Sequence, residues 1–247
     1  MDFYKVAFLL GAFICTGLRA DQPHNAVASL CEISKVDIVM LVDGSESISN
    51  REFCTMKAFI SQVVQNLPIG PNQVQIGLTQ FSTYSKTELD LNSHNNNQTL
   101  LQAIDAIQHM KGLTNTGRGL DHVLKHNFQP GAGMRPDSKK KVVLITDGES
   151  TDKTEIPAQN LKDSGIEIYV IGVGSHVHSQ HVINQLRTIA SEDTENHLYL
   201  FSTYQSFYDA AINISRNLCH DATNLEKQGL QADQTNSTGF TGAHRLV

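Results

Sequence analysis

The chain has 247 residues, and 40% of them are hydrophobic, which is enough to build the core of one large domain and excludes an intrinsically disordered chain. The formal net charge is −6 and no basic stripe is present, which argues against nucleic-acid binding.

The N-terminal segment has the pattern of a secretory signal peptide. A lysine precedes an apolar run from Val6 to Cys15, and Ala20 stands at a suitable cleavage position. The run is too short to cross a bilayer comfortably, so we expect residues 1–20 to be removed and the protein to be secreted, with no membrane span. Residues 21–35 are polar and predict a short leader.

Cysteines and glycosylation sequons suit an oxidising, extracellular location. Cys31 precedes the first expected strand and Cys219 follows the last helical pattern, so a disulfide between them would join the two ends of the domain. Cys54 is then either a free thiol or a link between two chains. Three sequons begin at Asn97, Asn213 and Asn236.

Strand and helix patterns alternate from residue 36 onward. Residues 37–42 are apolar on both faces, which is typical of a parallel strand covered by helices on both sides. Ser49 and Glu52 have the spacing of a capping box and predict a helix over residues 50–66. Residues 74–82 and 83–91 follow each other too closely for a crossover, so they predict a hairpin that adds one antiparallel edge strand.

The rest of the chain continues the alternation. We expect helices over residues 98–110, 116–127, 158–164 and 183–190, strands in "KVVLITDGES", "IEIYVIGVG" and "HLYLFS", and one closing helix over residues 203–218. This order predicts an α/β fold: a doubly wound, Rossmann-like, mostly parallel six-stranded sheet with one antiparallel edge strand and helices on both faces. The domain covers residues 36–219, and residues 220–247, with few apolar residues, predict a flexible tail.

Short oxygen-bearing side chains follow two of the buried strands. Asp43, Ser45 and Ser47 lie in "VDGSES", and Asp147 lies in "TDGES". Ligands of such sheets bind at the carboxyl ends of the strands, so we expect these residues to meet there, joined by Thr114 or Thr116 from "KGLTNTGRGL". A nucleophilic serine would require G-x-S-x-G and a phosphate loop G-x-x-x-x-G-K-[ST], and neither motif is present.

A divalent cation explains this set of side chains best. Carboxylates and hydroxyls are hard oxygen donors, which suit Mg²⁺, Mn²⁺ or Ca²⁺ and suit zinc poorly. The alternative, that the serines cap the next helix, leaves the second acidic turn unexplained.

The loop "GSHVHSQH" also carries three histidines, but no cysteine or acid stands at zinc spacing, so we expect these side chains to be exposed or to contact a ligand. They are His176, His178 and His181.

The segments "DIVMLVDGSES", "GLTNTGRGL" and "VVLITDGES" resemble, in this order, the three motifs of von Willebrand factor type A domains, called I domains in integrins. The resemblance covers roughly residues 36–218. It implies a metal-ion-dependent adhesion site that holds a divalent cation, Mg²⁺ first and Mn²⁺ or Ca²⁺ as alternatives, and binds an acidic side chain of a partner protein. The implied ligands are Asp43, Ser45, Ser47, Thr114 and Asp147, with Thr116 as the alternative threonine.

These features together predict a secreted adhesion or extracellular matrix protein and not an enzyme. The resemblance is to matrilin, collagen-associated and cochlin-like proteins, and it implies an extracellular protein ligand, with collagen among the candidates. The alternative is a structural matrix component that assembles through protein contacts and disulfides, such as a Cys54-linked homodimer, without metal-dependent binding.

Overall fold

The structure is a computed structural model, and it describes residues 35–219. The signal peptide, the leader, the tail, Cys31 and the sequon at Asn236 lie outside the described residues and stay predictions. Among the described residues, no helix is both long and apolar enough to cross a membrane.

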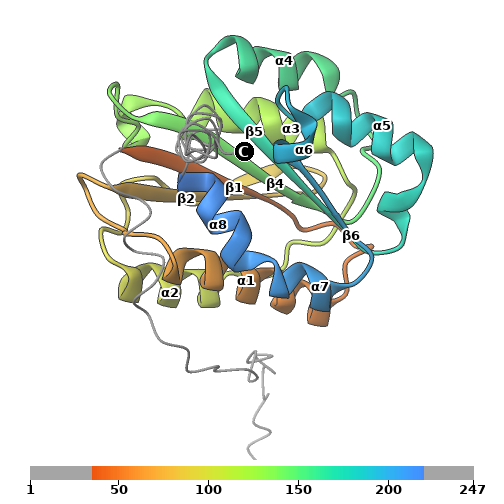
Figure 1. Ribbon diagram of the computed structural model, residues 1–247, viewed down its shortest axis with the longest axis horizontal. Coiled ribbons are helices and arrows are strands. Elements are labelled where there is room, and N and C mark those ends of the chain that lie inside the picture. The colour runs from red at the N-terminus through yellow and green to blue at the C-terminus, as the bar shows by residue number, and fades with distance from the viewer. Residues whose placement is uncertain (1–34, 220–247) are drawn as a thin grey trace, which may run out of the picture.

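One six-stranded sheet forms the centre of the domain (Figure 1). Only β2 and β3 pair in antiparallel fashion, and all other neighbours are parallel, which confirms the predicted mostly parallel sheet with one antiparallel edge strand. Across the sheet, the strands are β3 (Ser85–Leu89), β2 (Val74–Phe81), β1 (Val36–Asp43), β4 (Lys139–Thr146), β5 (Ile166–Val173) and β6 (Leu198–Phe201).

Helices cover both faces of this sheet, as the alternation predicted (Figure 1). One face carries α1 (Asn50–Gln65), α2 (Asn97–Ala106), α7 (Tyr204–Asp209) and α8 (Ala211–Cys219); the other carries α3 (Thr116–His122), α4 (Glu155–Asp163) and α5 (Gln180–Ile189), with the short α6 (Thr194–His197) before β6. Every residue of β1 is buried. Met40 and Val42 join one core cluster and Val39 and Leu41 the other, because side chains alternate along a strand.

Two predicted helices end differently in the structure. The helix expected over residues 98–110 ends at Ala106. There the buried ammonium of Lys57 donates to the carbonyls of Asp105 (2.6 Å) and Ile107 (3.1 Å), which satisfies two carbonyl groups at the helix end. The helix expected over residues 116–127 is α-helical to His122 and continues as a π-helix, η1 (Val123–Asn127). A turn at Ala210 also divides the expected closing helix into α7 and α8.

The two described cysteines correct one prediction. Cys54 on α1 and Cys219 at the end of α8 are both disulfide-bonded. A cysteine already bonded within the single chain is neither a free thiol nor available to link two chains, so both readings of Cys54 were wrong. The pairing of Cys31 with Cys219 involves a residue outside the described part of the chain and stays a prediction.

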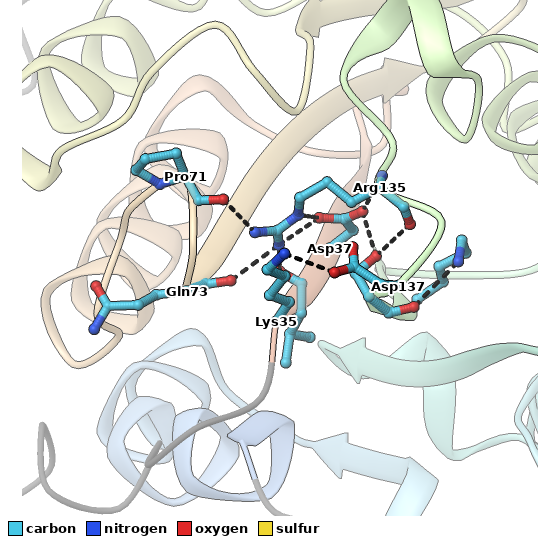
Figure 2. A network of polar contacts seen from close by, with 9 residues as sticks. Lys35, Asp37, Pro71, Gln73, Arg135 and Asp137 are labelled. Atoms are coloured by element: carbon cyan, nitrogen blue, oxygen red, sulfur yellow. Dashed lines mark hydrogen bonds and ion pairs between the residues drawn. The ribbon is translucent and has the colours of Figure 1, made fainter.

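The amino end of β1 is held by a network of polar contacts (Figure 2). Asp37 is fully buried and accepts hydrogen bonds from the backbone N–H and the Nε of Arg135, both at 2.8 Å. The same guanidinium donates to the carbonyls of Pro71, Val36 and Gln73 at 2.8–2.9 Å. The amino end of β1 is therefore stabilised by an ion pair whose polar atoms are hydrogen-bonded.

The strand order determines where a ligand site can form. From β1 the chain winds to β2 and β3 on one side and then returns to β4 on the other side of β1. The carboxyl ends of β1 and β4 thus flank the point where the winding reverses, which is where such sheets bind ligands. Asp43 ends β1, and Asp147 directly follows β4.

Candidate metal centre

The turn after β1 is built so that its backbone lies close to the neighbouring strand. The N–H of Gly44 donates to the carbonyl of Phe81 at 2.8 Å, and a Cβ at Gly44 would lie 2.2 Å from Oε1 of Gln80. A side chain at position 44 would therefore displace the buried side chain of Gln80. The N–H of Ser45 then turns back to Oδ1 of Asp43 at 2.9 Å, which holds the carboxylate beside the turn.

A chain of hydroxyls and carboxylates joins the ends of β1 and β4. The hydroxyl of Thr146 donates to Oδ2 of Asp43 at 2.6 Å. On the other side of the turn, the Oγ atoms of Ser45 and Ser47 lie 2.9 Å apart, and Ser47 donates to Oδ1 of Asp147 at 3.0 Å. Four of the five predicted ligands therefore meet at one place. Thr146 was not predicted, although it stands directly before Asp147 in the sequence.

The fifth predicted ligand comes from the loop before α3. Thr114 lines a pocket of about 500 Å³ together with Ser47 and Asp147, and its carbonyl accepts the N–H of Thr151 at 2.7 Å. Thr116, the alternative, is the first residue of α3, is buried, and does not line this pocket. The geometry favours Thr114.

The threonine loop is tied to the serine turn by contacts that the sequence did not reveal. The N–H of Glu46 donates to the carbonyl of Gly112 at 2.8 Å, and Nζ of Lys111 donates to the carbonyl of Ile48 at 3.0 Å. The ring of His109 stacks on Phe53 and places its Nε2 3.1 Å from the carbonyl of Ser45. These contacts hold the two loops in one arrangement.

Asp152 has a structural role at the start of α3. Its carboxylate accepts the N–H groups of Gly117 (2.7 Å) and Arg118 (2.9 Å) and the hydroxyl of Ser150 (2.7 Å). A carboxylate at this position satisfies free N–H groups of the first helical turn. It reaches α3 from the loop after β4, so no local sequence signal marks it as a cap.

The electrostatics of the site fit a cation. Asp43 is fully buried, and burial, with the nearby charge of Asp147, raises its pKa from 3.8 to about 6, although hydrogen bonds from Thr146 and Ser45 oppose the shift. Burial also raises the pKa of Asp147. No basic side chain among the described residues contributes to the shift at Asp43. A buried carboxylate without a basic partner is costly unless a cation compensates it.

A second observation concerns Tyr204 at the start of α7. Its hydroxyl is buried and has no hydrogen-bond partner among the described residues. Burial raises its pKa, and the charges of Asp147, Glu52 and Asp43 add to the effect. A buried hydroxyl beside three carboxylates is where an ion or its water would supply the missing partner. The residues present therefore fit a hydrated divalent cation.

The three histidines of the predicted loop do not converge. His176 lines the pocket, whereas Nε2 of His178 lies 3.0 Å from Oγ of Ser202 and Nε2 of His181 lies 2.8 Å from Oε1 of Glu149. Within residues 35–219 no group of three or more histidines, cysteines or acids is close enough to hold a metal ion, so any ion at the rim would depend on hydroxyls.

Two sequons fall in the described chain and differ in accessibility. Asn213 is exposed on α8. Asn97 is partly buried, and its Nδ2 donates to the carbonyls of Val64 (2.8 Å) and Leu67 (3.4 Å) at the end of α1. A sugar on Nδ2 would leave a single N–H for these two acceptors. Glycosylation at both positions stays a prediction, and Asn213 is the better placed.

Comparison with known proteins identifies the family. The sequence model of the von Willebrand factor type A domain matches residues 37–211. The chain therefore belongs to the von Willebrand factor type A domain family, as the motifs predicted.

Similar chains include large collagens and matrilins. The chain is 36% identical over 209 residues to the collagen alpha-1(XII) chain of Notophthalmus viridescens, covering 83% of this chain and 22% of the collagen chain. It is 33% identical over 192 residues to human matrilin-4, covering 76% of this chain and 30% of the matrilin. The chain thus spans less than a third of either relative's length.

Solved structures agree with the fold. Proximal thread matrix protein 1 from the mussel byssus, in a form with a zinc-occupied MIDAS motif, aligns with a TM-score of 0.69 at 27% identity, over 75% of this chain and 48% of that chain. The manganese-loaded TRAP protein of Plasmodium vivax aligns with a TM-score of 0.61 at 19% identity, over 75% of this chain and 74% of that chain, and supports the fold alone.

Proposed function

We propose that this protein is a secreted extracellular matrix or adhesion protein that binds a protein partner through a divalent cation. The cation would be held by Asp43, Ser45, Ser47, Thr114 and Asp147. The observation that carries the proposal is the hydroxyl and carboxylate chain from Thr146 to Asp147, with one fully buried carboxylate that no basic side chain of the described part of the chain neutralises. The collagen and matrilin relatives and the metal-occupied MIDAS of the mussel protein support the matrix role and the ion.

The chemistry of the site suits binding of an acidic side chain. A divalent ion in such a site supplies positive charge and an exchangeable position for a partner's carboxylate. The serine and threonine hydroxyls are neutral, so they bind the ion without cancelling its charge. Asp43 lies behind the serine turn, fully buried, and Ser47 is exposed, so one carboxylate stays at the back while a neutral hydroxyl faces the partner.

Apolar side chains beside the pocket extend this binding surface. Leu113, which directly precedes Thr114, is 58% exposed, and Tyr84 in the turn between β2 and β3 is 64% exposed. The N–H of Leu113 donates to Oγ1 of Thr83 at 3.0 Å, so the two loops support each other. Exposed leucine and tyrosine beside a polar centre are typical of interface residues that exclude water around it.

The test is a binding assay on immobilised collagen, the first candidate partner, carried out in parallel in Mg²⁺ and in EDTA. We expect binding in Mg²⁺ that is lost in EDTA and in Asp43→Asn. The exposed Asp209→Asn is the matched control, because the side chain of Asp209 on α7 accepts one hydrogen bond within residues 35–219, from Gln205. Binding that survives both EDTA and Asp43→Asn would favour the alternative, a structural matrix component without metal-dependent adhesion.

A further inference from the structure

The pocket contains one nitrogen donor that the family pattern of oxygens does not include. His176 opens the short helix η3 (His176–His178) after β5 and lines the same pocket as Ser47, Thr114 and Asp147. Gly174, at φ 105°, directly follows β5 (Ile166–Val173). Three strand ends, those of β1, β4 and β5, therefore contribute side chains to one pocket.

His176 also differs from its neighbours in having no partner. His178 is engaged by Ser202 and His181 by Glu149, whereas the imidazole of His176 makes no hydrogen bond or ion pair within the described residues. It is exposed, so it can turn toward the pocket without breaking a contact.

The nature of the donor decides which ions it favours. Mg²⁺ prefers oxygen ligands and binds imidazole poorly, whereas Zn²⁺ and other late first-row ions bind imidazole well. The hydroxyls and carboxylates alone are hard oxygen donors, which suit Mg²⁺ and suit Zn²⁺ poorly. One imidazole added to this set favours Zn²⁺ selectively and leaves the oxygen donors for Mg²⁺ unchanged.

We propose that His176 is a metal ligand that sets the ion preference of this site toward Zn²⁺ over Mg²⁺. The inference rests on the metal site proposed above and adds a residue to it. His176 turns inward when Zn²⁺ is bound and stays outside when Mg²⁺ is bound. The other two histidines of the loop take no part, because each is already held by a neighbouring side chain.

The test measures metal affinity directly, with the full chain and with ZnCl₂ or MgCl₂ as the probe in isothermal titration calorimetry. His176→Ala is compared with the matched control His178→Ala from the same loop. We expect His176→Ala to weaken Zn²⁺ binding at least tenfold and to leave Mg²⁺ affinity within twofold, while His178→Ala changes neither. The chain has eleven histidines, so zinc bound elsewhere is identified as the part that remains in Asp43→Asn.

A spectroscopic measurement separates direct ligation from an indirect effect. With Cu²⁺ at the site, electron paramagnetic resonance should show nitrogen coupling that disappears in His176→Ala and persists in His178→Ala. An unchanged ratio of Zn²⁺ to Mg²⁺ affinity in His176→Ala would overturn the proposal, and so would an equal loss of both ions. If Asp43→Asn leaves the binding of both ions intact, the proposed metal site itself fails, which is a different result.

Discussion

The two ends of β1 carry aspartates that are equally buried but differ in whether a basic side chain pairs with them. Asp37 at the amino end faces the guanidinium of Arg135 (Figure 2), at 2.6 Å. It also accepts a hydrogen bond from the hydroxyl of Ser138. Within residues 35–219, Asp43 at the carboxyl end accepts hydrogen bonds from a hydroxyl and an N–H and faces no basic side chain. The same residue type, at two positions six residues apart on one strand, is thus neutralised where it holds the fold and left charged where a cation would bind.

The largest effect should follow from breaking the neutralised end. Arg135→Met would leave Asp37 buried without its partner, so we expect the free energy of unfolding to fall by about 3–5 kcal/mol. Denaturant unfolding followed by circular dichroism measures this. Lys125→Met is the control, because Lys125 and Asp121 form an exposed pair that should contribute less than about 1 kcal/mol.

A double variant sharpens this result. Adding Asp37→Asn to Arg135→Met removes the unpaired charge, so we expect it to recover part of the lost stability. If the double variant is less stable than Arg135→Met alone, the ion pair is not what stabilises the amino end of β1.

The second prediction concerns pH at the other end of β1. In the metal-free protein, the folded state holds the Asp43 proton up to about pH 6, whereas the unfolded chain releases it near 3.8. The folded state therefore binds more protons in this window, and stability should fall as the pH rises from about 4 to about 6. The difference corresponds to about 3 kcal/mol.

Asp43→Asn isolates this effect, because other groups titrate in the same range. In EDTA, the stability of Asp43→Asn relative to the native protein should rise by about 3 kcal/mol between pH 4 and pH 7. Unfolding curves at several pH values give the difference. A difference independent of pH would show that Asp43 carries no uncompensated charge in the folded state.

The third prediction restores the missing charge. A cation that binds only the folded state at 100 times its dissociation constant should stabilise the native protein by about 2.7 kcal/mol. Asp43→Asn should gain little, because its site has lost the buried charge. Thermal melts with and without MgCl₂ or ZnCl₂ provide the measurement, and equal gains in both proteins would place the bound ion elsewhere.

Local signals in the sequence predicted much of the carboxyl end of β1. The apolar run of β1 and the spacing of Asp43, Ser45 and Ser47 predicted both the strand and the polar rim, because neighbours in sequence are neighbours at a strand end. The mostly parallel sheet with one antiparallel edge strand followed from the alternation of patterns. These features depend on short stretches of chain and on general rules of α/β sheets.

The remaining features depend on contacts between distant segments. The pair of Asp37 and Arg135 joins residues far apart in the chain, and Asp152 caps a helix that precedes it in sequence. The early end of α2 reflects Lys57 on another helix. No spacing rule predicts such contacts, because tertiary packing selects them.

The smallest predicted effect resolves which threonine serves the site. Thr114 lines the pocket and Thr116 does not, although two residues separate them and the sequence allowed either. Thr114→Ala should therefore weaken the binding of the ion about tenfold, equivalent to about 1.4 kcal/mol, because it removes one neutral oxygen donor. Thr116→Ala should lower stability through its buried position and leave metal affinity within twofold. Calorimetric titration of the two variants, beside an unfolding curve for each, separates affinity from stability; the reverse pattern would assign the ligand to Thr116 and would require the first turn of α3 to move toward Asp147.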